Sequence, residues 1–149
     1  MRIGLETNLS EKDLSYLNGE VGVVWRGKGI KVQFIIDTGS PRNVLSYSDA
    51  KRLGVKINLL KEGEVILIGG GRHQSYMFEG FEVIFIAENG LKVKDRIDVR
   101  ILVSGENGED KIPFILGTDF LREKKYKLFC DLANDIAFLE KDSEFLTAA

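Results

Sequence analysis

The chain has 149 residues with a formal net charge of −2, and 44% of its residues are hydrophobic and 30% are charged. This composition indicates one globular domain with its own hydrophobic core and argues against a disordered chain. The weakly acidic balance and the lack of a long apolar run argue against nucleic acid or a membrane as a partner.

The first clear elements form a predicted β-hairpin that leads into a polar turn. Residues 1–19 are mixed in character and give only a turn signal at their end, Asn18-Gly19. Residues 21–25 and 30–36 are apolar runs separated by a glycine-containing turn, which predicts two antiparallel strands. The second strand therefore delivers the chain directly to Asp37.

A short extended stretch and a short helix are expected next. Residues 43–46 are expected to be extended. Ser48 is a candidate N-cap for a helix over residues 49–53, which Gly54 would end.

A glycine-rich hairpin is predicted in the middle of the chain. Residues 65–68 form a compact apolar run that leads into three glycines, and residues 74–78 predict the return strand. The residues at the tip of this hairpin are Ile68, Gly69, Gly70 and Gly71.

The longest predicted strands cover residues 81–87 and 91–103. Asn89-Gly90 lies between them and is a strong hairpin signal. Apolar and charged residues alternate along the second strand, so one face is expected to be buried and the other wet. The residues predicted on the buried face are Leu91, Val93, Ile97, Val99 and Ile101.

The last third of the chain predicts one more strand, a helix and a hairpin. Residues 114–117 are apolar, and Thr118 is a candidate cap for a helix through residue 124. Residues 127–131 and 136–139 predict the final hairpin. Many strands with few short helices predict an all-β fold, a closed or folded-over barrel. We expect a single domain over residues 1–149, with a core of about 20–140 and extensions at both ends.

The turn after the second strand carries the clearest chemical signal. Asp37 follows a buried apolar strand, where a carboxylate is costly unless its charge is shared or hydrogen-bonded. Gly39 lets the backbone turn tightly beside that carboxylate. The order Asp37-Thr38-Gly39-Ser40 after apolar residues resembles the active-site turn of the aspartic proteases, although a turn of this composition can also be an ordinary one.

Three segments together resemble the retropepsin-like aspartic proteases, the viral type and its cellular relatives. They are the turn with Asn43-Val44-Leu45 after it, the glycine-rich hairpin tip, and Ile115-Leu116-Gly117 with the helix that follows. The resemblance covers roughly residues 20 to 140. It implies a closed barrel that is half of a two-fold symmetric enzyme, an aspartic endopeptidase in which paired carboxylates activate water.

The resemblance also assigns roles and partners. The chain has one Asp-Thr-Gly, so the second carboxylate would be Asp37 of another copy, in an obligate homodimer acting on an extended peptide or protein substrate. Thr38 would bond across the dimer axis, Gly39 would approach the carboxylates, and Ser40 would donate to the outer carboxylate oxygen, which favours an acidic optimum. Ile68 to Gly71 would form a flap that closes over the substrate. Ile115, Leu116 and Gly117 would support the turn, and no metal or organic cofactor would be needed.

Two departures from the family pattern concern the turn and the interface. Many viral members carry Arg or Lys at the place of Thr118, paired with an acidic residue after the turn. Here Arg42 and Asp119 would form such a pair with reversed polarity. The chain also continues past the helix through residues 127–140, so the viral dimer sheet built from chain ends would be replaced by something else.

Several alternatives stay open at the level of sequence. A retropepsin-like module could bind peptides and dimerise without cleaving them, and an unrelated small barrel could hold a small ligand as a monomer. Asp119 is an alternative second carboxylate within one chain. His73 is either a substrate contact or a solvated loop residue, and Trp25 belongs to the core or an interface.

Two remaining features argue against a phosphate-binding loop and against a catalytic cysteine. The three glycines lack the Gly-Lys-Ser/Thr of a phosphate-binding loop. The single cysteine, Cys130, lies among apolar residues and is expected to be a buried small hydrophobe. A single cysteine and an N-terminus without a signal-peptide core favour a cytoplasmic location.

Overall fold

The computed structural model describes residues 1–7, 16–68, 71–103 and 112–145. Ten strands and two short α-helices lie in this part of the chain, with three 3₁₀ turns. The strands are β1 (Arg2–Leu5), β2 (Asn18–Trp25), β3 (Lys28–Ile36), β4 (Val44–Ser46), β5 (Lys61–Ile68), β6 (Gly71–Ile86), β7 (Lys92–Val103), β8 (Phe114–Leu116), β9 (Lys127–Asp131) and β10 (Ile136–Glu140). The helices are α1 (Tyr47–Arg52), α2 (Thr118–Glu123), η1 (Ile57–Leu59), η2 (Leu132–Asn134) and η3 (Ser143–Phe145).

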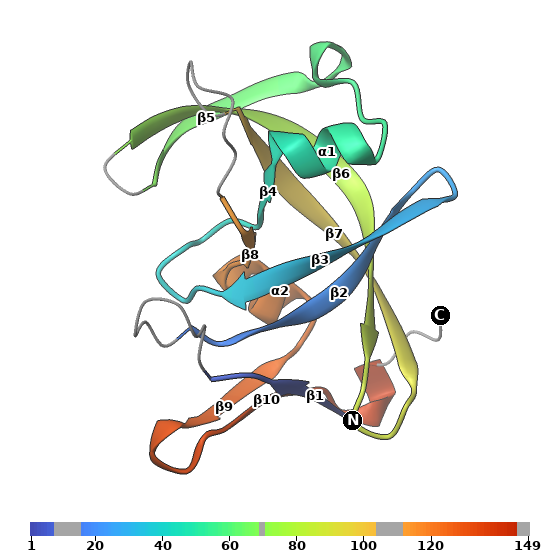
Figure 1. The fold of residues 1–149 in the computed structure, drawn as a ribbon, viewed down its shortest axis with the longest axis vertical. Coiled ribbons are helices and arrows are strands. Elements are labelled where there is room, and N and C mark those ends of the chain that lie inside the picture. The colour runs from blue at the N-terminus through green and yellow to red at the C-terminus, as the bar shows by residue number, and fades with distance from the viewer. Residues whose placement is uncertain (8–15, 69–70, 104–111, 146–149) are drawn as a thin grey trace.

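Six strands close into a barrel, as the sequence predicts. They are hydrogen-bonded in the order β2-β3-β8-β4-β7-β6, and a second pairing of β2 with β6 closes the ring (Figure 1). β5 pairs with the first part of β6 and extends the sheet beyond the barrel. The β3–β8 and β4–β7 pairs are parallel. The ends of β3, β8 and β4, which are far apart in sequence, therefore lie side by side.

Aromatic rings fill the centre of the barrel. Phe34 and Phe85 meet edge to face with ring centroids 5.5 Å apart, and Phe81 contacts Phe114 in the same way at 6.1 Å. All four are almost fully buried. Offset and edge-to-face contacts of this kind add to the hydrophobic stabilisation of the core. Trp25 is half-buried and packs against Phe78 at 4.6 Å, so it is a core contact.

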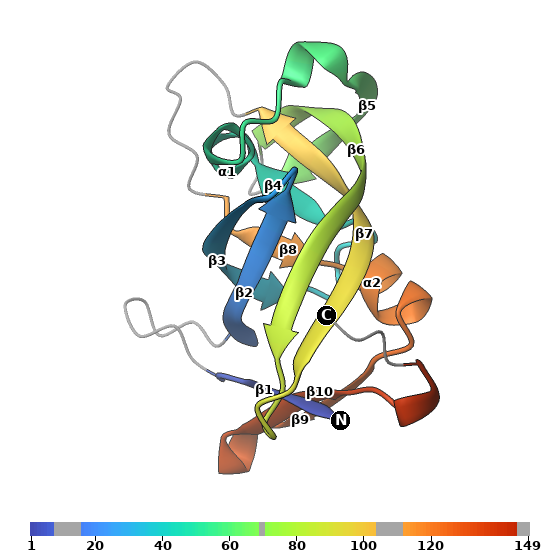
Figure 2. The same ribbon diagram turned by 90° about the vertical axis from the view of Figure 1, so that its right-hand side faces the viewer.

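A second sheet, in the order β1-β10-β9, lies at the lower end of the barrel in Figures 1 and 2. The mixed sequence of residues 1–19 gave no strand, yet β1 forms because Ile3 pairs with Leu139 of β10 and both are buried. A strand whose partner is at the other end of the chain carries little local signal. β9 and β10 confirm the predicted final hairpin.

The predicted burial of alternate apolar side chains is confirmed within β7. Val93, Ile97, Val99 and Ile101 are buried, whereas Leu91 precedes the strand and is 45% exposed. The hairpin before β7 has Gly90 at φ +83°, a left-handed conformation that suits glycine.

The predicted strands 74–78 and 81–87 are in fact one strand, β6. A register shift between Phe78 and Phe81 marks a bulge in its pairing with β7, and Gly80 there has φ +73°. A bulge bends a strand without ending it, so one continuous strand stands where two were predicted.

Both predicted helix caps were one or two residues too late. Ser46, not Ser48, caps α1, because its hydroxyl accepts the N–H of Asp49 at 3.1 Å. Thr118 is the first residue of α2, and Gly117 is its cap. Gly54 ends the first helical segment as expected, at φ +79°.

Two single-residue expectations were wrong. Cys130 is exposed, on β9, which is the outer strand of its sheet. His73 lies within β6, opposite Ile66 of β5, and not in a loop. Among the described residues, no helix is long and apolar enough to cross a membrane.

Candidate active site

The turn after β3 holds Asp37 by backbone hydrogen bonds. The Asp37 N–H donates to the Leu116 carbonyl at 3.1 Å, which ties the turn to β8. The Gly39 N–H donates to Asp37 Oδ1 at 2.9 Å, and the Ser40 N–H donates to the Asp37 carbonyl at 3.1 Å. Asp37 is half-buried, whereas Thr38 and Gly39 are exposed. The turn therefore fixes the direction of one carboxylate at a solvent-facing edge.

The Ser40 hydroxyl does not contact the carboxylate as expected. It donates to the Arg42 carbonyl at 2.8 Å and so closes the turn internally. A nearby backbone oxygen is a strong acceptor, and local side-chain to backbone bonds of this kind are common for serine. The expected donation from Ser40 to Asp37 is thus absent from the single chain.

Gly117 lets β8 and α2 lie directly against the turn. A Cβ at this position would come closer to the Ser40 and Arg42 carbonyls than real Cβ atoms do. The Thr118 N–H donates to the Ser40 carbonyl at 2.8 Å, and the Asp119 N–H donates to the Pro41 carbonyl at 3.1 Å. The structure therefore brings the segment 115–117 beside the turn.

Asn43 joins three segments of the site, and sequence reasoning gave it no role. Its Oδ1 accepts the Gly117 N–H at 3.0 Å, and its Nδ2 donates to the Asp98 carbonyl at 3.0 Å. It is 4% exposed. This buried amide forms hydrogen bonds with backbone groups just after β8 and on β7, so it fixes both relative to the turn. No local pattern reports such long-range partners.

Ion pairs connect the turn to α2 and to β5. Arg42 Nη1 lies 3.3 Å from Asp119 Oδ2, which confirms the pair predicted with reversed polarity. Arg42 Nε also lies 3.5 Å from Glu64 of β5, and Arg100 of β7 lies 3.3 Å from Glu64. Glu64 was missed because it is close to Arg42 only in the folded sheet.

The electrostatics of Glu64 follow from these contacts. A hydrogen bond from its own backbone N–H lowers the pKa of Glu64, and Arg100 and Arg42 lower it further, against a smaller opposing effect of burial. Glu64 is 45% exposed, so solvent screens the interaction. The cluster links β5 to the turn in the ionised state of Glu64.

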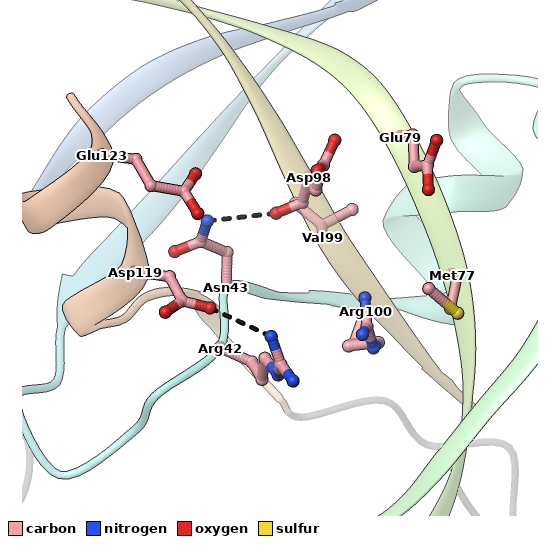
Figure 3. Close-up of a pocket in the computed structure, with 9 residues that line it drawn as sticks. All are labelled: Arg42, Asn43, Met77, Glu79, Asp98, Val99, Arg100, Asp119 and Glu123. Carbon is pink, nitrogen blue, oxygen red and sulfur yellow. Dashed lines mark hydrogen bonds and ion pairs between the residues drawn. The ribbon is translucent and has the colours of Figure 1, made fainter.

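A small polar pocket of about 120 Å³ lies beside Arg42. Figure 3 shows the side chains that line it. The Asp119 side chain reaches toward Arg42 there, and the amide of Asn43 spans toward β7. Asp119 is thus engaged with Arg42. Within the described ranges, no group of three or more His, Cys, Asp or Glu side chains is placed to hold a metal ion.

A more open groove of about 460 Å³ lies between the turn and β5. Ser40 and Val44 contribute from the turn side, and Ile66 from β5. The full lining is Ser40, Pro41, Arg42, Val44, Glu64 and Ile66. β5 and β6 form the expected antiparallel hairpin, with Ile68 opposite Gly71. The predicted tip residues Gly69 and Gly70 lie outside the described residues.

Comparison with known proteins gives a consistent family and fold. A family model described as aspartyl protease matches residues 21–120. The fold is similar to that of a retropepsin-like aspartic protease from Rickettsia conorii, with a TM-score of 0.61 and 20% identity over 93% of this chain and 89% of that one. It is also similar to the EIAV protease complexed with the inhibitor HBY-793, with a TM-score of 0.52 and 17% identity over 82% of this chain and 100% of that one. A search of curated proteins finds no significant match. The predicted retropepsin-like fold is confirmed.

Proposed function

This chain belongs to the aspartyl protease family, and from that premise we propose that it is an aspartic endopeptidase whose site is shared by two copies. Each copy contributes one Asp37. The observation that carries the proposal is the turn itself, which presents a single carboxylate at an exposed edge with its direction fixed by the Gly39 N–H. The chain has one Asp-Thr-Gly, so a carboxylate pair needs a second chain.

The proposed chemistry follows from placing two carboxylates about 3 Å apart, where like charges cannot both ionise easily and one proton is shared. The ionised carboxylate accepts a proton from water, and the oxygen of that water attacks the peptide carbonyl carbon. The protonated carboxyl donates to the carbonyl oxygen. The first carboxyl, which now carries the proton from water, donates it to the nitrogen, while the second carboxylate accepts a proton from a hydroxyl of the tetrahedral intermediate. The C–N bond breaks, the amine leaves, and the pair again holds one shared proton. The macroscopic titration steps belong to the pair and not to one residue.

The groove between the turn and β5 supports a peptide substrate in extended form. Its walls are a strand on one side and the segment after the turn on the other, so a peptide lying between them could bond to backbone on both. Ile66 offers apolar contact, while Arg42 and Glu64 offer charge of both signs. In this proposal, the β5–β6 hairpin covers the bound peptide and excludes bulk water.

The test is cleavage of a mixed peptide pool from about pH 3 to about pH 7, with products read by mass spectrometry. We expect Asp37→Asn to lower the rate by roughly 1,000-fold or more, because the pair acts as a unit. Asp49→Asn is the matched control, since Asp49 lies on α1 and pairs with the exposed Arg52. It should retain cleavage.

Mixing the two proteins tests the shared site. Excess Asp37→Asn should inhibit wild-type enzyme by drawing its chains into mixed dimers that hold only one Asp37. Inhibition that fails to appear while mixed dimers are shown to form would rule out the shared pair. A folded, dimeric wild type that binds peptides but cleaves none of them at any pH would instead identify a silent peptide-binding module.

A further inference from the structure

A buried nitrogen in the β5–β6 hairpin has no hydrogen-bond partner. Among the side chains that the structure describes, His73 Nδ1 is the one buried nitrogen or oxygen atom in this state. A buried polar atom without a partner loses its hydration and gains no bond in return, so native structures rarely keep one. Beside a candidate binding site, such an atom indicates a partner that the single chain does not contain.

The strand register places His73 on the face of the hairpin that looks toward the candidate active site. His73 lies directly opposite Ile66 of β5. Side chains directly opposite each other in an antiparallel pair share one face, with their Cβ atoms about 5 Å apart. Ile66 lines the groove beside the turn that carries Asp37. In Figure 1 the tip end of this hairpin lies on the same side of the barrel as that turn. We therefore expect a peptide in the groove to extend toward His73.

The neighbouring polar groups on this face already have partners. Ser75, two residues after His73, donates its hydroxyl to the Glu64 carbonyl. The Glu64 carboxylate is held by two arginines. Ile66 packs against a small cluster of buried aliphatic side chains, which are Ile35, Val44, Leu102 and Ile115. Beside this aliphatic surface, His73 Nδ1 is a polar atom that is free to bind a ligand.

We propose that His73 selects the substrate by a hydrogen bond to a hydroxyl or carboxamide side chain at the peptide position that faces the β5–β6 hairpin. This inference rests on the proposed function and names the substrate class for it: peptides with Ser, Thr, Asn or Gln at that position. An imidazole nitrogen accepts or donates one hydrogen bond according to its protonation, and hydroxyl and carboxamide groups can do both.

The selection follows from the cost of leaving the nitrogen unpaired. Alternate side chains of an extended peptide point to the same face, so one position meets His73 while its neighbours point away. An apolar side chain at that position covers the nitrogen and gives it no partner. A site built to bond a polar group therefore discriminates strongly against an apolar group of the same shape.

Cleavage of paired peptides tests the selection. Peptides from the mixed pool are compared in pairs that differ at one position, Thr against Val or Asn against Leu. We expect the wild type to prefer the polar member at one position by about tenfold in kcat/KM. His73→Leu should lose that preference. His73→Asn should keep much of it, because its polar atoms are bonded to Cγ as Nδ1 is. His73→Gln places them one bond further out and should lose it.

Arg72→Leu is the matched control for His73→Leu. Arg72 is the preceding residue of β6, is exposed, and lies opposite Leu67 on the other face of the hairpin. It should keep the wild-type preference. An active His73→Leu enzyme with unchanged preference would overturn the proposal. An equal loss of kcat/KM for both members of every pair would also overturn it, because His73 would then act on all peptides alike.

The ring itself gives a readout that needs no cleavage, because His73 is the only histidine in the chain. Labelling histidine with the NMR-active nitrogen isotope makes Nδ1 visible in a long-range proton–nitrogen spectrum. In Asp37→Asn, which should leave peptides intact, the polar member of a pair should shift the Nδ1 signal and its apolar counterpart should not.

The two readouts separate this inference from the proposed function. Peptides that bind without any shift of Nδ1, from an enzyme that cleaves them, would reject the role of His73 and leave the protease proposal standing. A wild type that cleaves nothing, but whose Nδ1 signal shifts with polar and not with apolar peptides, would reject the protease proposal and keep His73 as the selecting contact of a peptide-binding module.

Discussion

At the scale of single residues, the missing side chain of Gly117 positions the candidate catalytic turn. A methyl group there would press on the Ser40 and Arg42 carbonyls, which are backbone atoms and cannot rotate away. We expect Gly117→Ala to destabilise the fold by about 1–3 kcal/mol, as overpacking does. Peptide cleavage should fall by more than the loss of folded protein explains, because the displaced turn carries Asp37.

Gly29→Ala is the matched control for Gly117→Ala. Gly29 lies on β3, the strand that delivers the turn, and a Cβ there would meet its nearest atoms at an ordinary 3.7 Å. Its effect on stability should stay within about 0.5 kcal/mol. Urea unfolding and cleavage assays on both variants make the comparison. Equal effects of the two substitutions would show that the close contact at Gly117 has no special cost.

Sequence reasoning located Asp37, Thr38 and Gly39 because their signal is local: an apolar strand, a carboxylate and a glycine in consecutive order. It included Asn43 in the motif without giving it a role and did not find Glu64, because their partners Gly117, Asp98 and Arg100 are distant in sequence. Ser40 was assigned an acceptor in the carboxylate, but the Arg42 carbonyl is the acceptor that its hydroxyl uses. The residues of a motif were predictable, and the contacts that orient them were not.

At the scale of elements, Glu64 couples β5 to the turn only while it is ionised. Its pKa lies below the reference value of 4.5, chiefly through its backbone hydrogen bond and then through Arg100. The stabilisation is therefore complete above about pH 4.5 and is lost as the pH falls through the lower pKa of the folded state. The exposed setting limits the effect to less than about 1 kcal/mol.

We expect Glu64→Gln to loosen β5 at neutral pH to the degree that acid loosens it in the wild type. Hydrogen exchange of the β5 amides, followed from about pH 3 to about pH 7, measures this. The wild type should exchange faster at the acid end after correction for intrinsic rates, and Glu64→Gln should show little such dependence. Glu62→Gln on the same strand is the control and should behave as wild type. A wild-type profile that is flat with pH would contradict the coupling.

The sequence predicted the hairpins, but it did not predict that β6 is one continuous strand or that β1 exists. The sequence predicted two separate strands on either side of Gly80, yet β6 continues through a bulge at that point because β7 pairs with it on both sides. The sequence did not predict β1, because its partner strand β10 lies at the other end of the chain. Patterns of two or three residues describe turns well. They do not show which distant strand completes a sheet.

At the scale of the whole molecule, a buried polar cluster fastens the terminal sheet to the barrel. Lys141, just after β10, lies 2.9 Å from Asp95 of β7, and both side chains are 3% exposed. The Tyr126 hydroxyl, between α2 and β9, donates to the other Asp95 oxygen at 2.6 Å. The Lys141 ammonium also lies 4.6 Å over the Tyr126 ring. The β1-β10-β9 sheet is thus anchored to the barrel by three buried side chains.

Tyr126→Phe tests how much this anchor contributes and how it responds to pH. Burial first, and then the Asp95 carboxylate, raise the pKa of Tyr126 well above its ordinary value of 10.0. Losing the hydroxyl removes a buried hydrogen bond to a charged group, which should cost about 1–3 kcal/mol near pH 7. Below about pH 10 the tyrosine is protonated in both states, so this stabilisation is complete.

Above about pH 10 the unfolded chain ionises Tyr126 while the folded chain keeps its proton, so the stabilisation declines as the pH rises. The difference in unfolding free energy between wild type and Tyr126→Phe should therefore narrow from pH 9 to about pH 11. Urea unfolding at each pH gives that difference directly. Tyr47→Phe, at the half-buried start of α1, is the matched substitution at a second tyrosine. A Tyr126 difference that stays constant or grows with pH would mean that the hydroxyl is not held by Asp95, and the anchor would reduce to the Asp95–Lys141 pair.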